Sequence, residues 1–271
     1  MKKQLTLALV LATTLTFTAC EEKKKQDGTT ATEPAAAETQ EATQEVVAEV
    51  AEKSAEKPSG DFKTVKIGEQ VWMAENLNYA AKGSKCGGTN LMESEESFYL
   101  LEDENTENCD KYGRLYNWAT AMALPSDCND KSCASQISEK HRGICPSGWH
   151  IPSNADWNVL MKFVDPSCSD NSDCAGAGTK LKTTSGWEKT FFEGKSGNGT
   201  DDYGFAALPG GEGYSGGDFR SVGNSATWWS ASEGSSAVFY TYIRSMSNLD
   251  GKVRWSESPR IHFFSVRCIQ N

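Results

Sequence analysis

The sequence predicts one α+β domain over residues 61–271, because short strand patterns enclose two helical segments. Alternating apolar and polar residues at 64–73 predict a hairpin, and alternation returns between residue 237 and the C-terminus. Two stretches between them place apolar residues at helical spacing. All eight tryptophans lie in this block, which is long enough to bury one sizeable core.

The predicted hairpin joins residues 64–67 to residues 70–73. Gly68 and Glu69 form its two-residue turn, and glycine at the first turn position is typical of such hairpins. This element opens the domain.

A first helix is predicted over Tyr112–Leu124. Its apolar residues recur at the spacing of one helix face, and Pro125 then ends the helix. These residues are Leu115, Trp118, Ala119 and Met122.

A second helix is predicted to begin after Ser153. Ser153 and Asp156 have the spacing of a capping box, and Pro152 with Trp157 has the spacing of a hydrophobic staple. The buried stripe consists of Trp157, Leu160, Met161 and Val164.

The rest of the domain is predicted as strands and glycine-rich loops. Residues 204–208 and 226–231 are short candidate strands. Residues 237–246 alternate well, and Phe264, Val266 and Cys268 alternate in a closing strand.

The N-terminus has the features of an export signal over residues 1–19. Two lysines precede an apolar stretch too short to span a bilayer. Ala19 then precedes Cys20, which resembles the acylation site of a bacterial lipoprotein signal, although Phe17 stands where leucine is usual. A plain secretory signal is the alternative. Residues 20–60 carry no aromatic side chain and predict a disordered tether.

The cysteines indicate an oxidising compartment. Without Cys20 the count of nine becomes eight, and an even number in an exported chain favours disulfides. Eight cysteines allow on the order of a hundred pairings. We expect the following set: Cys128–Cys133, Cys168–Cys174, Cys145–Cys268 and Cys86–Cys109.

No metal or other cofactor is predicted. The chain has no Cys-x-x-Cys pair, and its three histidines lie apart from the cysteines. The oxygen-rich loop 165–174 lacks the spacing of an EF-hand, so calcium there is an alternative that no motif supports. The net charge of −10 argues against nucleic acid as a partner.

Five ordered motifs resemble those of the Fibrobacter succinogenes major paralogous domain. They include Tyr-Gly-Arg-Leu-Tyr-Asn-Trp at 112–118 and Phe-Ser-Val-Arg-Cys at 264–268; the others are residues 65–77, 145–157 and 202–210. The resemblance implies an exported, often lipid-anchored protein, and it implies no particular reaction.

A shorter resemblance concerns the fold. Residues 150–157 are similar to the helix start of formylglycine-generating-enzyme-like domains, and the ending at 266–268 is similar to their terminal strand. This resemblance implies a C-type-lectin-like fold with two helices, short antiparallel strands and long glycine-rich loops. The calcium- and sugar-binding motifs of calcium-dependent lectins are absent from the sequence.

Candidate ligand-binding residues concentrate between residues 208 and 260. Aromatic faces stack on sugar rings, while aspartate and arginine side chains bond sugar hydroxyls, so we select Tyr214, Asp218, Arg220, Trp229, Arg244, Trp255 and Arg260. Core packing is the alternative for Trp228 and Trp229, which on a strand should point one inward and one outward. We expect Tyr214 and Trp255 to be exposed.

These observations predict a non-catalytic binding module, held in the bacterial envelope by acylated Cys20. We expect the outer membrane, with surface export as a further option, and a polysaccharide or an envelope or extracellular protein as ligand. The first alternative is a hydrolase using Asp202 with Glu212 or Glu233 as paired carboxylates. The second is a purely structural surface protein.

Overall fold

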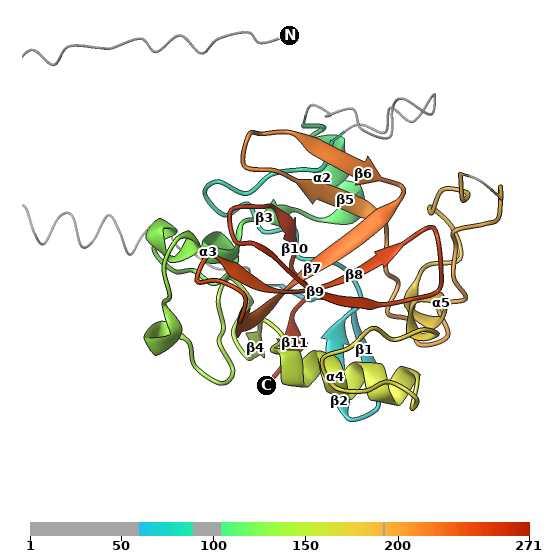
Figure 1. The fold of residues 1–271 in the computed structure, drawn as a ribbon, viewed down its shortest axis with the longest axis horizontal. Coiled ribbons are helices and arrows are strands. Elements are labelled where there is room, and N and C mark those ends of the chain that lie inside the picture. The colour runs from blue at the N-terminus through green and yellow to red at the C-terminus, as the bar shows by residue number, and fades with distance from the viewer. Residues whose placement is uncertain (1–59, 89–103, 192) are drawn as a thin grey trace, which may run out of the picture. The chain divides into compact units, whose positions relative to one another are not determined.

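The computed structural model describes residues 60–88, 104–191 and 193–271. The predicted signal, Cys20 and all of the tether except Gly60 lie outside these residues. Within them the chain forms a mixed α+β unit of short strands and short helices (Figure 1). None of the helices in the described ranges has the length and apolar character that a membrane crossing requires.

The described strands and helices are short, and most have fewer than nine residues. In chain order they are β1 (Thr64–Ile67), β2 (Gln70–Met73), α2 (Glu107–Tyr112), β3 (Leu115–Tyr116), α3 (Trp118–Ala121), η2 (Ser126–Asn129), η3 (Ala134–Gln136), β4 (Trp149–His150), α4 (Asn154–Val164), α5 (Ala177–Leu181), β5 (Gly210–Gly213), β6 (Phe219–Val222), β7 (Ser225–Glu233), β8 (Tyr240–Ser247), β9 (Arg254–Pro259), β10 (Phe264–Ser265) and β11 (Ile269–Gln270).

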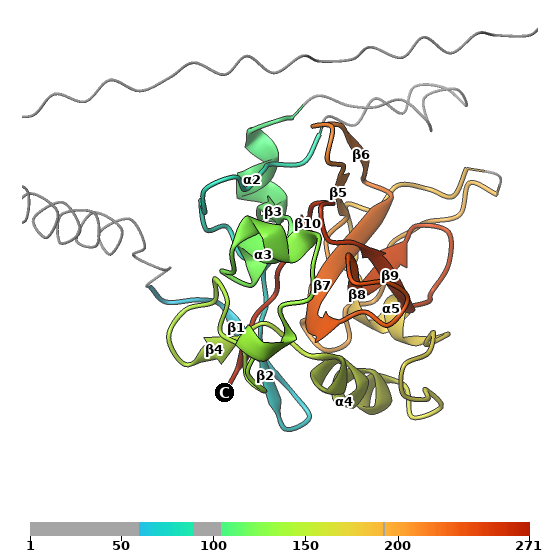
Figure 2. The same cartoon turned by 60° about the vertical axis from the view of Figure 1, so that its left-hand side comes forward.

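The strands form two sheets. The smaller has the order β1-β2-β11-β4, and the larger has the order β3-β10-β7-β5-β6, with β8 pairing to β7 and β9 pairing to β8. Strand β7 is the longest and crosses the centre of the larger sheet (Figures 1 and 2). It pairs in parallel with β5 and β10 and antiparallel with β8.

Strand β7 separates two hydrophobic cores. Ala226 and Trp228 face one core, with residues of α4, α5 and the β1–β2 hairpin. Trp229 and Ala231 face the other, with residues of α3 and the C-terminal segment. In the first core four aromatic rings meet at centroid distances of 4.9 to 6.3 Å: Trp72, Trp157, Phe205 and Trp228. A residue in the middle of β7 is therefore buried whichever way it points.

The C-terminal segment joins both sheets instead of forming the one closing strand expected. Strand β10 pairs with β3 and β7 in the larger sheet, whereas β11 pairs with β2 and β4 in the smaller. Between them Val266 O accepts from Leu77 N at 2.8 Å and Cys268 O accepts from Met73 N at 3.0 Å. The N-terminal hairpin and the C-terminus are thereby locked together.

Two local predictions are confirmed. Hairpin β1–β2 turns at Gly68, whose φ is +62°. Helix α4 begins after Ser153, whose Oγ accepts from Asp156 N, while the Asp156 carboxylate accepts from Ser153 N. The predicted stripe of α4 is buried throughout.

The helix predicted over Tyr112–Leu124 is present only in part, as α3 over Trp118–Ala121. Helix α2 ends at Tyr112, and the chain turns at Gly113, whose φ is +78°. A Cβ at this position would lie 2.8 Å from Cβ of Asn76. Strand β3 then pairs with β10 before α3 begins. The four apolar residues are all buried, but strand pairing overrides the helical spacing at Leu115.

Residues 204–208 are not a strand, and 237–239 are not part of one. In the first segment only Ala207 forms a bridge, to Lys182. Asp201 and Ala206 have positive φ values, and Ala206 N donates to Asp201 Oδ1 at 2.8 Å, so the segment is folded into a loop. Strand β8 begins only at Tyr240, because the preceding residues form the turn from β7.

Four cysteine pairs lie at disulfide distance, and they are the four pairs expected from the sequence. They are Cys86–Cys109, Cys128–Cys133, Cys145–Cys268 and Cys168–Cys174. The pair Cys145–Cys268 ties the segment before β4 to the C-terminal segment, across the second core.

Candidate binding groove

A shallow polar groove of about 390 Å³ lies on one face of the larger sheet. Its lining is dominated by hydroxyl and charged side chains: Glu212, Arg220, Ser221, Ser225, Thr227, Ser245, Met246, Ser247, Leu249 and Arg254. The groove therefore offers hydrogen-bond donors and acceptors alongside apolar contact area.

Strand register brings the hydroxyl groups together. Ser225 lies opposite Ser247 and Thr227 lies opposite Ser245 in the β7–β8 pair, while Ser245 lies opposite Arg254 in the β8–β9 pair. Residues at every second position share a face, so these side chains form cross-strand rows. Ser225 Oγ is buried and has no hydrogen-bond partner among the described residues.

Arg220, predicted as a ligand-binding residue, forms one wall. Its Nε lies 2.9 Å from Glu212 Oε1, which also accepts from the Tyr214 hydroxyl at 2.8 Å. The guanidinium carbon lies 4.3 Å from the centroid of the Tyr214 ring. A carboxylate and an aromatic face together fix the orientation of this guanidinium.

Arg254 forms the opposite wall. Its two terminal nitrogens lie 3.3 and 2.5 Å from the two carboxylate oxygens of Asp250, which is a bidentate pair. Lys182 holds the turn between β8 and β9, because its Nζ donates to Ser247 O at 3.0 Å and Asp250 O at 2.9 Å. Burial lowers the pKa of Lys182 to about 8.

His262 backs the Tyr214 wall. The two ring centroids are 4.7 Å apart, and His262 Nδ1 lies 3.2 Å from Ser258 Oγ. Burial lowers the pKa of His262 below its ordinary value, so this ring is neutral at pH 7.

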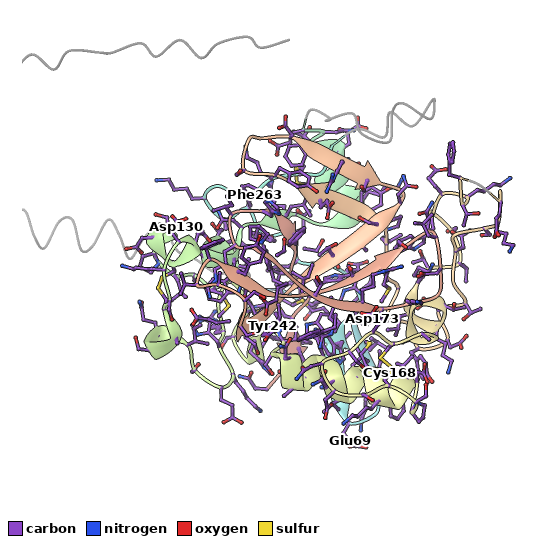
Figure 3. The ribbon with its side chains drawn as sticks, viewed as in Figure 1. Glu69, Asp130, Cys168, Asp173, Tyr242 and Phe263 are labelled. Atoms are coloured by element: carbon purple, nitrogen blue, oxygen red, sulfur yellow. A yellow bond between two sulfur atoms is a disulfide. The ribbon has the colours of Figure 1, made fainter. Side chains whose placement is uncertain are left out.

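Of the other predicted residues, Asp218 and Trp255 remain near the surface but do not line the groove. Asp218 lies in the turn between β5 and β6, where its carbonyl accepts from Tyr214 N. Trp255 lies on the opposite face of the sheet, stacked on Tyr242 with ring centroids 5.0 Å apart. Tyr242 is labelled in Figure 3, beside the strand pair β8–β9. Tyr214 and Trp255 are both partly buried, not fully exposed.

Three predicted residues are buried, which corrects their assignment to a ligand surface. Trp229 is 1% exposed and donates from Nε1 to Tyr116 O, so it belongs to the second core. Trp228 is buried as well, because β7 has a core on each side. Arg244 is 1% exposed, and its Nη2 lies 3.1 Å from Asn158 Oδ1 of α4. Burial lowers the pKa of Arg244 to about 10.

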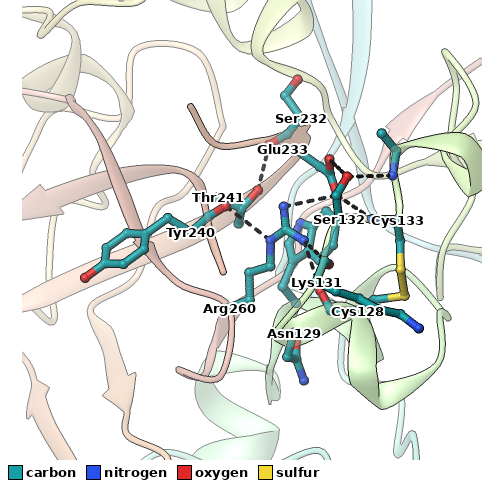
Figure 4. Close-up of polar contacts among 12 residues, drawn as sticks. Cys128, Asn129, Lys131, Ser132, Cys133, Ser232, Glu233, Tyr240, Thr241 and Arg260 are labelled. Atoms are coloured by element: carbon teal, nitrogen blue, oxygen red, sulfur yellow. Dashed lines mark hydrogen bonds and ion pairs between the residues drawn. A yellow bond between two sulfur atoms is a disulfide. The ribbon is translucent and has the colours of Figure 1, made fainter. Parts of the chain in front are cut away.

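Arg260 is the third buried residue and holds the loop between Cys128 and Cys133 (Figure 4). Its Nη1 donates to Cys128 O and Lys131 O, each at 3.0 Å, and Nη2 lies 3.1 Å from Glu233 Oε1. Glu233 also accepts from Cys133 N at 2.9 Å. Arg260 therefore has a structural role.

The carboxylates named for a hydrolase lie on separate elements with separate partners. Asp202 is in the loop after α5, Glu212 on β5 is held by Arg220 and Tyr214, and Glu233 at the end of β7 is held by Arg260. The second and third already serve in ion pairs, so the geometry favours positioning roles for them.

The described residues contain no group of three or more histidine, cysteine or carboxylate side chains that could hold a metal ion. In the oxygen-rich loop 165–174 the carboxylates of Asp165 and Asp173 accept hydrogen bonds from backbone N–H groups of the chain. Asp165 accepts from Ser167 N and Gly176 N, and Asp173 accepts from Trp255 N.

Two adjoining cavities of about 370 and 350 Å³ share Lys63, Glu75, Asn76 and Asn78 in their linings, and the second also reaches Arg267. Asn76 Oδ1 accepts from Nε and Nη2 of Arg267 and from Nε1 of Trp228, at 2.8 to 3.0 Å. Arg267 Nη1 also donates to Phe205 O. The polar atoms of these side chains are hydrogen-bonded to one another and to the backbone. Asn76, Trp228 and Arg267 therefore have a structural role, because they connect three distant segments of the chain.

The groove residues that sequence reasoning missed include Arg254 and the hydroxyl residues Ser225, Thr227, Ser245 and Ser247. The signal of these four hydroxyl residues in the sequence is their place at every second position of two neighbouring strands. Trp228, Trp229 and Arg244 lie in the same two strands but are buried.

The model of one protein family, described as the Fibrobacter succinogenes major domain, matches residues 65–270. That range includes every residue of the groove. No curated protein and no solved structure gives a significant match to the chain.

Proposed function

Because the chain belongs to the Fibrobacter succinogenes major domain family, we propose that it is a non-catalytic binding module of the bacterial envelope. Its ligand in this proposal is a polysaccharide, bound in the groove between Arg220 and Arg254. An envelope or extracellular protein is the other ligand class that the sequence suggested.

The observation that carries the proposal is the fixed orientation of the polar groups in the groove. Arg220 is held by Glu212 and Tyr214, and Arg254 is held bidentately by Asp250. Between them lie the partly exposed Ser245 and Ser247 of β8, whereas Thr227 and the hydroxyl of Ser225 on β7 are buried. Donors and acceptors that are already ordered lose little entropy on binding, which suits a ligand rich in hydroxyl groups.

A glycan array and pull-downs with insoluble polysaccharides test the proposal on the purified protein. We expect retention on at least one polymer, and Arg220→Ala and Arg254→Ala should each weaken it about tenfold, because each removes a charge-assisted hydrogen bond. Arg142→Ala is the matched control, since Arg142 contacts Cys145 O outside the groove. Retention on no polymer, or equal weakening by the control, would refute the saccharide ligand.

Membrane attachment through Cys20 is a separate part of the proposal. The apolar stretch before Ala19-Cys20 and the even number of remaining cysteines support it. In cells fed an alkyne-labelled palmitate, the wild type should incorporate label into the membrane fraction. Cys20→Ser should lose the label, whereas Cys86→Ser should keep it. Label retained in the Cys20 variant would contradict acylation at this residue. The proposed membrane is the outer membrane.

We also propose that the domain has the C-type-lectin-like fold. Pairing of β11 with the N-terminal hairpin and the long stretches of loop between short strands support this proposal. An experimental structure in which the terminal strands pair differently would contradict it.

A further inference from the structure

Both arginines of the groove are charge-balanced by carboxylates of the protein itself. Arg220 Nε lies 2.9 Å from Glu212 Oε1, and Arg254 Nη2 lies 2.5 Å from Asp250 Oδ2. The side chains of both pairs are partly exposed, with values of 42% and 19% for the first and 35% and 31% for the second. The charges thus face the groove as neutral pairs.

Among the residues that the structure describes, no other charged side chain lines the groove. The remaining lining residues are serines, Thr227, Met246 and Leu249. His262 stands behind Tyr214, and its burial keeps the ring neutral at pH 7. An anionic ligand would therefore find no uncompensated cation to bind.

The paired side chains still have hydrogen-bonding atoms that a neutral ligand can use. Within the described part of the chain, no hydrogen bond engages the two terminal nitrogens of Arg220 or the second carboxylate oxygen of Glu212. A hydroxyl group can donate to the carboxylate and accept from the guanidinium, so neighbouring hydroxyls of a sugar can use both partners at once. A ligand carboxylate can only accept, and Glu212 would repel it.

We infer that the groove selects uncharged sugar units over uronate, sulfated or phosphorylated ones. The inference rests on the proposed polysaccharide-binding function and specifies its ligand class. The net charge of −10 on the whole chain acts in the same direction, because it repels polyanions.

Two polymers with the same backbone test this inference. The purified protein is run in affinity electrophoresis against hydroxyethyl cellulose and carboxymethyl cellulose, and against fully methyl-esterified homogalacturonan and polygalacturonate as a second pair with a shared backbone. We expect at least about tenfold stronger retention by the neutral member, because the anion forfeits a charge-assisted bond. That retention should be unchanged between about 0.02 and about 0.5 M NaCl, since screening acts only on charged ligands.

The outcomes separate the two levels of the proposal. Equal or stronger retention by the anionic polymer, falling with salt, overturns the selectivity and leaves polysaccharide binding standing. Retention by no polymer in this set or on the glycan array overturns the proposed function itself.

Glu212→Gln provides a second test, because it releases the Arg220 charge while keeping a similar shape. Retention by carboxymethyl cellulose should rise about tenfold, and the rise should disappear at high salt. Asp250→Asn is the second variant and should act in the same way through Arg254. Glu69→Gln, in the exposed turn of the β1–β2 hairpin, is the control. If neither groove variant changes the preference for charge, the inference is wrong.

Discussion

At the scale of single residues, Arg260 shows why a charged side chain that the sequence assigns to a ligand surface can be buried. It is 1% exposed, lies over the Trp118 ring at 4.1 Å and bonds three backbone carbonyls as well as Glu233. A sequence shows that such a side chain is polar, but the loop carbonyls that satisfy it come from residues about 130 positions away. Burial of arginine is therefore not readable from its neighbours in sequence.

Arg260→Ala should destabilise the domain by roughly 3 kcal/mol, because it removes a buried guanidinium that pairs with Glu233 and donates to three backbone carbonyls. Urea unfolding followed by tryptophan fluorescence measures the change. Lys131→Ala is the control: its ion pair with Asp127 is exposed, and its loss should cost less than about 0.5 kcal/mol. A similar loss in both variants would contradict the structural role of Arg260.

Glu257 should make the free energy of unfolding of the domain depend on pH in the acid range. Burial raises the pKa of its carboxyl, but hydrogen bonds from Ser235 and Ser236 outweigh burial and lower the pKa from 4.5 to about 2. Because the folded-state pKa is the lower one, the stabilisation is present above pH 4.5 and is lost as pH falls towards 2.

Comparison of urea midpoints for wild type and Glu257→Gln, at neutral pH and near pH 2, tests this dependence. The variant should be less stable at neutral pH, by on the order of 1 kcal/mol, and the difference should shrink in acid. Glu193→Gln, on an exposed loop, should show neither effect. A pH-independent difference would contradict the assignment.

At the scale of elements, local signals decided which predictions were confirmed. Helix α4 carries its own start signal, because Ser153 and Asp156 bond each other within one turn. The segment Tyr112–Leu124 has the same apolar spacing without such a cap at its start, and Gly113 interrupts it. Its strand β3 pairs with β10, about 150 residues later, and Leu115 also bridges Lys85, 30 residues earlier. Long-range pairing of this kind leaves no local pattern.

Ser153→Ala should therefore destabilise α4 by about 1 kcal/mol, the usual cost of losing an N-cap. Thermal unfolding measures it, and Ser147→Ala, at an exposed position before β4, is the control. An unchanged melting temperature would show that packing alone maintains the start of the helix.

The groove likewise combines residues that are close in sequence with residues that only strand pairing brings together. Tyr214 and Arg220 come from one hairpin, and sequence reasoning selected both. Arg254 and the serine rows reach the same surface only through the β7–β8–β9 register, which depends on what covers each face of the sheet. The presence of a polar surface was predictable, but its composition was not.

At the scale of the whole molecule, the disulfides differ in the length of chain that they close. Cys145–Cys268 spans 123 residues and Cys128–Cys133 spans 5. Loop-closure entropy assigns about 5 kcal/mol to the first and about 2 kcal/mol to the second. The Cys145→Ala/Cys268→Ala double variant should accordingly lose more stability in urea than the Cys128→Ala/Cys133→Ala variant. The reverse order would contradict the entropic account.

The split C-terminal segment also bears on the order in which the domain can assemble. A chain that emerges with its N-terminus first presents Cys145 and both partners of β11 long before residues 264–270 arrive. Until then neither sheet is complete, and the Cys145 thiol has no partner while the six other cysteines of the domain emerge before or after it. Correct oxidation is therefore tied to the last few residues to appear, so a nascent chain truncated before Phe264 should accumulate mispaired cysteines.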